Sequence, residues 1–212
     1  MQRWDVTSAS VVRWLYDKAI TAWYFATSRL SARIWLSACD TVGSGTKVYG
    51  RPHVENRGRI VIGSRVRISC DWAPVELVTG SDGVIEVADG AFINYGSLIS
   101  ARKRVRIGAS VMVGNYSIIG DTDIPGIGEP RPGPSGEPRE IEIGDGAWLA
   151  ARVTVLPGAR IGAGAVIAAG SVVAGEIPAG AVAGGIPARV LKRATSGAHS
   201  AAPVRSAEHV GP

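Results

Sequence analysis

The chain has 212 residues, of which 46% are hydrophobic and 6% aromatic, and it contains 28 glycines. This length allows one ordinary domain with a buried core, and the surplus of glycine is unusual for a packed globule but typical of a solenoid with tight corners. The net charge of +5 comes from scattered basic residues, which argues against nucleic-acid binding, and the two cysteines, Cys39 and Cys70, lack metal-site spacing and suggest reduced thiols in a cytoplasmic protein.

Residues 1–41 form the first segment, which we expect to be helical, chiefly over residues 10–38. Apolar residues such as Leu15 and Trp23 recur there at helical spacing. The longest stretch without charge, residues 19–28, is ten residues long, whereas a membrane-spanning helix needs about 20. Two interpretations remain open. The helix packs on the end of the solenoid or on a sister subunit, or it lies on the inner face of a membrane as a peripheral contact.

Residues 42–193 follow a period of six. From residue 143 an aliphatic residue recurs at every sixth position, and a second inward position follows four residues after each. The first series is Ile143, Leu149, Val155, Ile161, Ile167 and Val173, and the second is Ala147, Val153, Ala159, Ala165, Ser171 and Ile177. This period fits neither an amphipathic helix nor a single alternating strand. It predicts an all-β fold, a left-handed parallel β-helix with three short strands in each coil of 18 residues.

The same period extends upstream with interruptions, through Val42, Val48, Val54, Ile62, Ile68, Val87, Ile93, Ile99, Ile107, Val113 and Ile119. Residues 124–140 break it with five prolines and four glycines, which predicts an extended loop. Residues 194–212 are rich in Ala, Ser, Pro and Gly without periodicity, and we expect a disordered tail.

Four short motifs lie in the C-terminal repeats: Gly144-Asp-Gly-Ala-Trp148, Leu156-Pro-Gly158, Ala169-Gly-Ser-Val-Val173 and Gly185-Ile-Pro-Ala-Arg189. With them, residues 42–193 resemble the hexapeptide-repeat acyltransferases, among them maltose, galactoside and exopolysaccharide O-acetyltransferases. The resemblance implies a homotrimer, without a metal, that moves an acetyl or another short acyl group from acyl-CoA. The implied acceptor is a hydroxyl of a saccharide or small metabolite.

The resemblance also implies where acyl-CoA would lie, between neighbouring subunits. The pantetheine arm would follow small residues, with Trp148 near the acyl end and a basic group near the nucleotide phosphates. The small residues are Ala150, Ala151, Ala168, Ala169 and Ser171, and the basic group is Arg189, Lys192 and Arg193.

The catalytic residue is less well defined. In the family a histidine shortly after an Asp-Thr-Asp motif serves as general base. Here the motif is residues 121–123 and the histidine position is Pro125. Asp123 or Asp121 would serve as base if burial raised its pKa, and Asn94 matches a family position near the acceptor. His53 would reach the site only from a neighbouring subunit.

Two alternatives to this base stay open. In the first, the acceptor is an amine, a thiol or a hydroxyl activated by its own neighbour, and it needs less activation by a general base. Otherwise, the protein is a catalytically weak or inert trimeric binding or scaffold protein.

Overall fold

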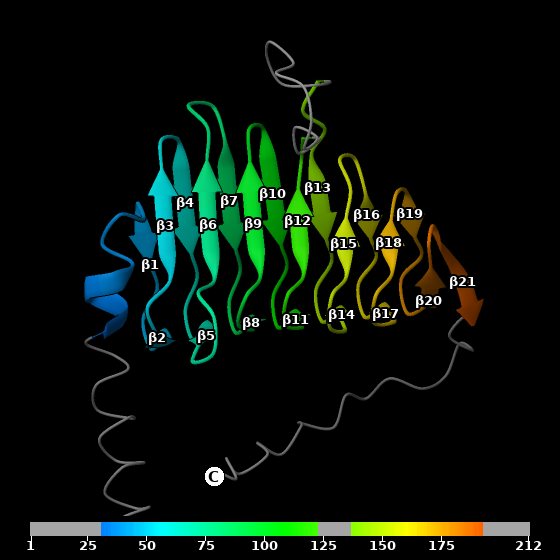
Figure 1. Cartoon of the computed structure of the whole chain (residues 1–212), viewed down its shortest axis with the longest axis horizontal. Coiled ribbons are helices and arrows are strands. Elements are labelled where there is room, and N and C mark those ends of the chain that lie inside the picture. The colour runs from blue at the N-terminus through cyan, green and yellow to red at the C-terminus, as the bar shows by residue number, and fades with distance from the viewer. Residues whose placement is uncertain (1–30, 123–136, 193–212) are drawn as a thin grey trace, which may run out of the picture.

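The computed structural model describes residues 31–122 and 137–192. Residues 31–35 form a short helix and residues 36–38 a turn, so the helix ends three residues before the expected boundary. Residues 10–30 of the expected helix, most of the loop at 124–140 and the tail lie outside the described residues. The described chain winds as a left-handed parallel β-helix, whose successive coils follow one another along the long axis (Figure 1). The predicted fold class is therefore confirmed.

Each coil contributes one strand to each of three sheets, which we name A, B and C. Sheet A consists of β1 (Thr41–Val42), β4 (Arg59–Ile62), β7 (Val84–Val87), β10 (Arg104–Ile107), β13 (Ile141–Ile143), β16 (Arg160–Ile161) and β19 (Glu176–Ile177). Sheet B consists of β2 (Lys47–Gly50), β5 (Arg67–Cys70), β8 (Phe92–Ile93), β11 (Met112–Val113), β14 (Trp148–Leu149), β17 (Val166–Ile167), β20 (Val182–Gly185) and β21 (Ala188–Lys192). Sheet C consists of β3 (His53–Asn56), β6 (Glu76–Thr79), β9 (Leu98–Ala101), β12 (Ile118–Gly120), β15 (Thr154–Val155) and β18 (Val172–Val173).

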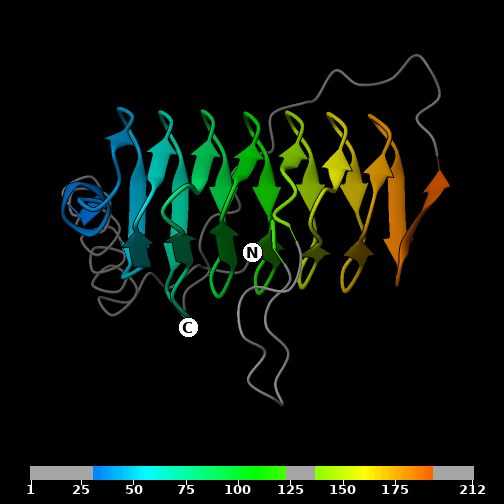
Figure 2. The same cartoon turned by 90° about the horizontal axis from the view of Figure 1, so that it is seen from above.

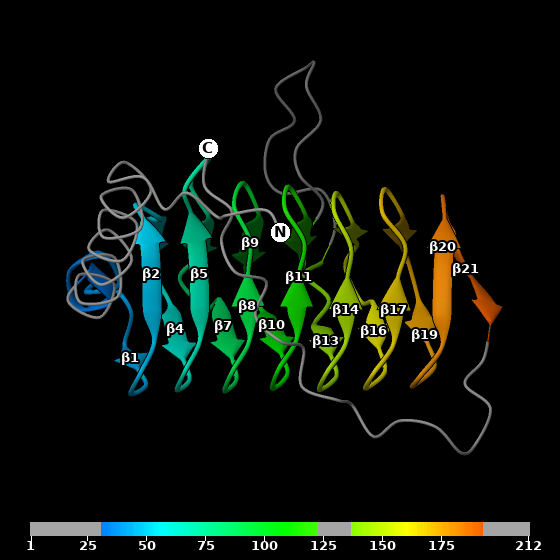
Figure 3. The same cartoon turned by 90° about the horizontal axis from the view of Figure 1, so that it is seen from below.

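The strands pair in parallel from coil to coil, and the view from above shows the coils side by side (Figure 2). The last strand is the exception, because β21 turns back and pairs antiparallel with β20 (Figure 3). This hairpin covers the C-terminal edge of sheet B, where an open strand would otherwise present unpaired backbone groups.

The predicted inward positions form the core. Both series of the C-terminal repeats are buried, with exposures of 3% or less. Of the upstream positions, Val48 and those from Ile62 to Ile119 pack in the same cluster, while Val42 and Val54 are partly buried against it. A six-residue period thus produces three flat faces whose side chains alternate between the core and the surface.

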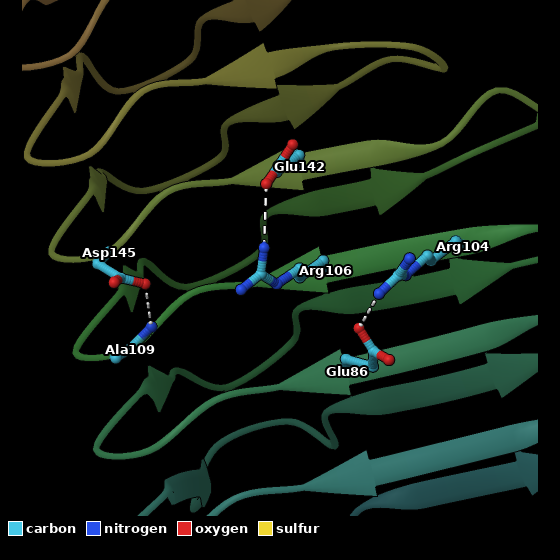
Figure 4. Close-up of polar contacts among 6 residues, drawn as sticks. All are labelled: Glu86, Arg104, Arg106, Ala109, Glu142 and Asp145. Carbon is cyan, nitrogen blue, oxygen red and sulfur yellow. Dashed lines mark hydrogen bonds and ion pairs between the residues drawn. The ribbon is translucent and has the colours of Figure 1, made fainter.

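The outward faces of the three sheets differ in character. One column on sheet A alternates in charge through Glu86, Arg106, Glu142, Arg160 and Glu176. Ion pairs join Arg106 to Glu142 at 3.1 Å and Arg104 to Glu86 at 2.7 Å (Figure 4). The matching column on sheet C is uncharged from β9 onward, through Leu98, Ile118, Thr154 and Val172. Sheet B carries an apolar column of Phe92, Met112, Trp148, Val166 and Val182.

Candidate active site

The corner that joins sheet B to sheet C carries half of the candidate site residues that the sequence predicts. We call residues 94–97, 114–117, 150–153 and 168–171 the B–C edge. Backbone bonds stack its corners in register, from Asn94 N to Val113 O at 3.0 Å, from Gly114 N to Leu149 O at 2.8 Å and from Ala150 N to Ile167 O at 2.9 Å. One column of the edge therefore consists of Asn94, Gly114, Ala150, Ala168 and Gly184.

The backbone amides on this edge differ in whether they have a hydrogen-bond acceptor. Ala150 N and Ala168 N donate to the next coil, at 2.9 and 2.8 Å. By contrast, the N–H groups of Ala151 and Ala169 have no acceptor among the described residues. They lie one coil apart, about 4.8 Å along the axis. The edge therefore offers a shallow path of methyl groups and free donors.

Ser171 does not lie on this path. Its side chain is 1% exposed, and its hydroxyl accepts a bond from Gly185 N at 3.1 Å. Ser97 and Ser117, in the same row of the edge, are also buried and donate to carbonyls of the next coil at 3.1 and 3.4 Å. The hydroxyl of Ser171 thus holds coils together in the interior, which the sequence did not predict.

The expected basic group lies on the closing strand. Arg189 pairs with Gly184 across the β20–β21 hairpin, so Arg189 continues the column of Ala150, Ala168 and Gly184. Lys192 pairs with Val182, next to the column of Trp148 and Val166 on sheet B. Arg193 lies outside the described residues. Both described cations are exposed and have no ion pair within the described chain.

Trp148 lies on β14, immediately before the edge. Its outward side chain is 46% exposed, between Met112 and Val166 of the neighbouring coils. A large exposed apolar ring beside a path of small residues is a typical feature of a ligand-binding surface.

Asp121 is buried just after β12, with 0% exposure. Its carboxylate accepts bonds from the backbone N–H groups of Arg102, Lys103 and Arg104, at 2.8, 2.6 and 2.8 Å. Its own carbonyl accepts from Arg139 N at 2.9 Å, on the far side of the loop. Both carboxylate oxygens are occupied, which favours a structural role for this residue over that of a base. Asp123 and Pro125 lie outside the described residues.

Asn94 lies on the B–C edge, and its Oδ1 accepts a bond from Tyr95 N at 2.9 Å. Its Nδ2 has no partner among residues 31–122 and 137–192. His53 is exposed on β3, which lies three coils from β12 in sheet C. At about 4.8 Å per coil, this separates His53 from the coil of Asp121 by about 14 Å along the axis.

Neither thiol belongs to the edge. Burial, with a smaller contribution from the charge of Asp40, raises the pKa of Cys39 to about 11, and burial raises the pKa of Cys70. Both cysteines therefore stay protonated at neutral pH, and their reactivity is low.

Over 31–122 and 137–192, His, Cys, Asp and Glu nowhere gather in threes as metal ligands would. Over the same ranges no helix has the length and apolar character needed to cross a membrane.

Comparison with known proteins places the repeats in a wider group. Residues 140–175 match the family model described as bacterial transferase hexapeptide (six repeats). Over 202 residues the chain is 27% identical to the probable acetyltransferase Rv3034c of Mycobacterium tuberculosis, which covers 88% of this chain and 63% of that protein. Over 120 residues it is 35% identical to the putative lipopolysaccharide biosynthesis O-acetyl transferase WbbJ of Escherichia coli, covering 52% of this chain and 61% of WbbJ. The chain thus spans about three fifths of the length of these curated relatives.

The fold is also shared with solved structures. AntD, an N-acyltransferase from Bacillus cereus in complex with dTDP and 3-hydroxybutyryl-CoA, superposes with a TM-score of 0.62 at 18% identity, covering 78% of this chain and 88% of AntD. At this identity the similarity concerns the fold alone. Repeat, sequence relatives and fold agree, and the chain is a hexapeptide-repeat protein of the left-handed β-helix class, related in sequence to acetyltransferases.

Proposed function

We propose that the protein is an acyltransferase that moves an acetyl or another short acyl group from acyl-CoA to a hydroxyl of an acceptor. The column on the B–C edge carries this proposal. Ala150 and Ala168 leave an extended pantetheine arm free to approach the backbone, and the amides of Ala151 and Ala169 are free to bind its carbonyls. The column ends beside Arg189, a suitable partner for a phosphate.

The residues at the two ends of this path indicate the direction in which acyl-CoA would lie. Arg189 and Lys192 lie near its C-terminal end and would bind the nucleotide phosphates. Asn94 lies at the opposite end with a free amide nitrogen. The thioester would therefore point toward the N-terminal coils, with Trp148 beside the acyl end, and the acceptor would bind near Asn94.

We also propose a homotrimer in which sheet C faces the three-fold axis. The uncharged column of Leu98, Ile118, Thr154 and Val172 suits a buried contact, whereas the charged column of sheet A suits solvent. Each B–C edge then lies beside the corner between sheets C and A of the next copy, where Asp121 follows β12. The two edges together would form the groove for acyl-CoA.

Assembly can be tested with one substitution on each face. Ile118→Arg places a charge in the proposed interface and should abolish the trimer, because an unpaired buried charge is strongly unfavourable. Glu176→Arg on sheet A should leave it intact. Light scattering after size exclusion should give three times the 22.0 kDa of one chain for the parent and for Glu176→Arg. A parent chain that runs as a monomer contradicts this assembly.

The proposed trimer also limits which residue can act as the general base. Rotation about an axis parallel to the β-helix preserves height, so His53 of either copy stays about 14 Å from the coil of Asp121. Asp123 follows Asp121 by two residues in the sequence, and the coil of Asp121 also carries Gly114. We propose Asp123 as the general base: it takes the proton from the acceptor hydroxyl, the oxygen attacks the thioester carbon, and the C–S bond breaks to release CoA.

Turnover tests this assignment. With acetyl-CoA and a set of saccharide acceptors, the chain should release CoA, which a thiol reagent detects at about pH 7.5 with little background from the protonated Cys39 and Cys70. Asp123→Asn should lower kcat by about 10²–10⁴-fold, and acetyl-CoA binding should persist. Unchanged turnover in Asp123→Asn dismisses Asp123 as the base, and turnover only with amines or thiols replaces the hydroxyl acceptor.

A further inference from the structure

Two tyrosines pack against each other on the B–C edge, in the coils before the small residues, and we call this pair the Tyr95–Tyr116 step. The rings of Tyr95 and Tyr116 meet edge to face, with centroids 5.5 Å apart and an interplanar angle of 89°. Tyr116 N donates to Tyr95 O at 3.0 Å, so the two residues belong to stacked corners. Tyr116 is 45% exposed, which is unusual for a ring held in this way.

The backbone of Tyr116 adopts a conformation that is unfavourable for a residue with a side chain. Its φ is 56°, in the left-handed region, and the same position of the other corners holds Gly96 with φ 68°, Arg152 with φ 59° and Gly170 with φ 70°. Glycine adopts this conformation without cost, whereas a tyrosine pays for it. A Cβ on Gly96 would lie 2.5 Å from Tyr116 Cε1, so the absence of a side chain at Gly96 makes room for the ring.

The polar groups around the step have spare hydrogen-bonding capacity. Asn94 Nδ2, the side-chain amide of Asn115 and the hydroxyls of both tyrosines have no partner in the described part of the chain. An exposed aromatic ring with unpaired amides at its border suits a ligand that has one apolar face and a rim of hydroxyls. A pyranose ring has this chemistry, because its axial C–H groups form a face and its hydroxyls both donate and accept.

We propose that the Tyr95–Tyr116 step is the acceptor-binding site, which we call the seat, and that it selects a pyranose. The pyranose would stack on Tyr116 and accept hydrogen bonds from Asn94 and Asn115. This inference rests on the proposed acyl transfer. The step lies on the same edge as Ala150 and Ala168 but toward the N-terminal coils. The acceptor ring would thus lie at the thioester end of the path for the pantetheine arm.

The test uses methyl α-glycosides of glucose, galactose, mannose and rhamnose as probes, with saturation-transfer NMR on the full chain. At least one glycoside should receive saturation at the C–H groups of one ring face. Tyr116→Gly removes the ring and relieves the positive φ at this position, so the melting temperature should hold or rise. This variant should weaken binding of that glycoside about tenfold, the factor expected for the loss of one aromatic contact. Tyr116→Phe keeps the ring and should stay within about twofold of the parent.

Each outcome decides between the two proposals. Glycoside binding that is lost in Tyr116→Gly but kept in Tyr116→Phe supports the seat. No glycoside signal in a sample that binds acetyl-CoA overturns the seat and leaves the acyltransferase in place. No binding of acetyl-CoA in the same sample overturns the proposed function. Loss of the trimer in Tyr116→Gly would instead identify Tyr116 as an interface residue and also overturn the seat.

Discussion

Asp121→Ala should lower the free energy of unfolding by about 3–5 kcal/mol. The substitution leaves the backbone N–H groups of Arg102, Lys103 and Arg104 without the buried acceptor that now binds all three, and each buried unpaired donor costs about 1–3 kcal/mol. Urea denaturation at a fixed protomer concentration measures this loss, because the stability of a trimer depends on concentration.

A matched control for Asp121→Ala is Asp145→Ala. Asp145 is exposed, and its carboxylate accepts a single bond among the described residues, from Ala109 N at 2.8 Å (Figure 4). The loss of this carboxylate should therefore cost at most about 1 kcal/mol. Asp121→Asn keeps one acceptor oxygen and should fall between the two. If Asp121→Asn were as stable as the parent yet had lost turnover, the structural role would be wrong and Asp121 would be a candidate for the base.

Gly162→Ala should destabilise the fold by about 2–3 kcal/mol. A Cβ at this corner would lie 2.6 Å from Ala179 Cα and would also contact Ala179 N, in the backbone of the next coil. Because that backbone is held by the bond from Gly162 N to Ile177 O at 2.8 Å, the clash is relieved only by forcing two coils apart.

Gly175→Ala is the control for this effect in the same coils. A Cβ there meets no atom within 4 Å, and its φ lies outside the left-handed region. This variant should be neutral or more stable by up to about 1 kcal/mol, since alanine restricts the unfolded chain. Equal urea midpoints for the two variants would show that the coils are not packed as closely as described here.

The period of six predicted the core well because one simple physical rule decides it. An aliphatic residue at every sixth position has to point into the prism, and Ile143, Leu149 and Val155 do so. The second inward position is equally reliable, since a coil has room for only one small or branched side chain there. Even the slip between Ile99 and Ile107 left both residues buried, because the extra length sits in the corner at residues 102–103.

The polar interior could not be predicted in this way. Periodicity places Ser171 inside but does not reveal that its hydroxyl binds Gly185 N. Asp121 resembled a catalytic carboxylate because it stands in an Asp-Thr-Asp motif, yet its environment is made by three amides of the preceding coil. Contacts of this kind depend on how two coils stack, which no single repeat specifies.

The proposed path for acyl-CoA could be predicted from the sequence only in part. The sequence pointed to Ala150, Ala151, Ala168 and Ala169 through resemblance, and the structure brings them to one edge. It also brings Arg189 into line with them through an antiparallel turn that interrupts the repeat. A chain reversal of this type leaves no periodic signal. The Tyr95–Tyr116 step could not be predicted for a similar reason, because the sequence does not show that Gly96 makes room for the ring of Tyr116.

Binding of acetyl-CoA to the B–C edge is the measurement that tests the central claim most directly. At a hundredfold excess over its dissociation constant, a ligand of the folded state adds about 2.7 kcal/mol, which should raise the melting temperature by about 5–10 °C. Ala169→Glu, on the edge, should abolish this shift, while Ala163→Glu, at the equivalent exposed position between sheets A and B, should retain it. No shift in the parent with any short-chain acyl-CoA, or an equal shift in both variants, would contradict a thioester site on this edge.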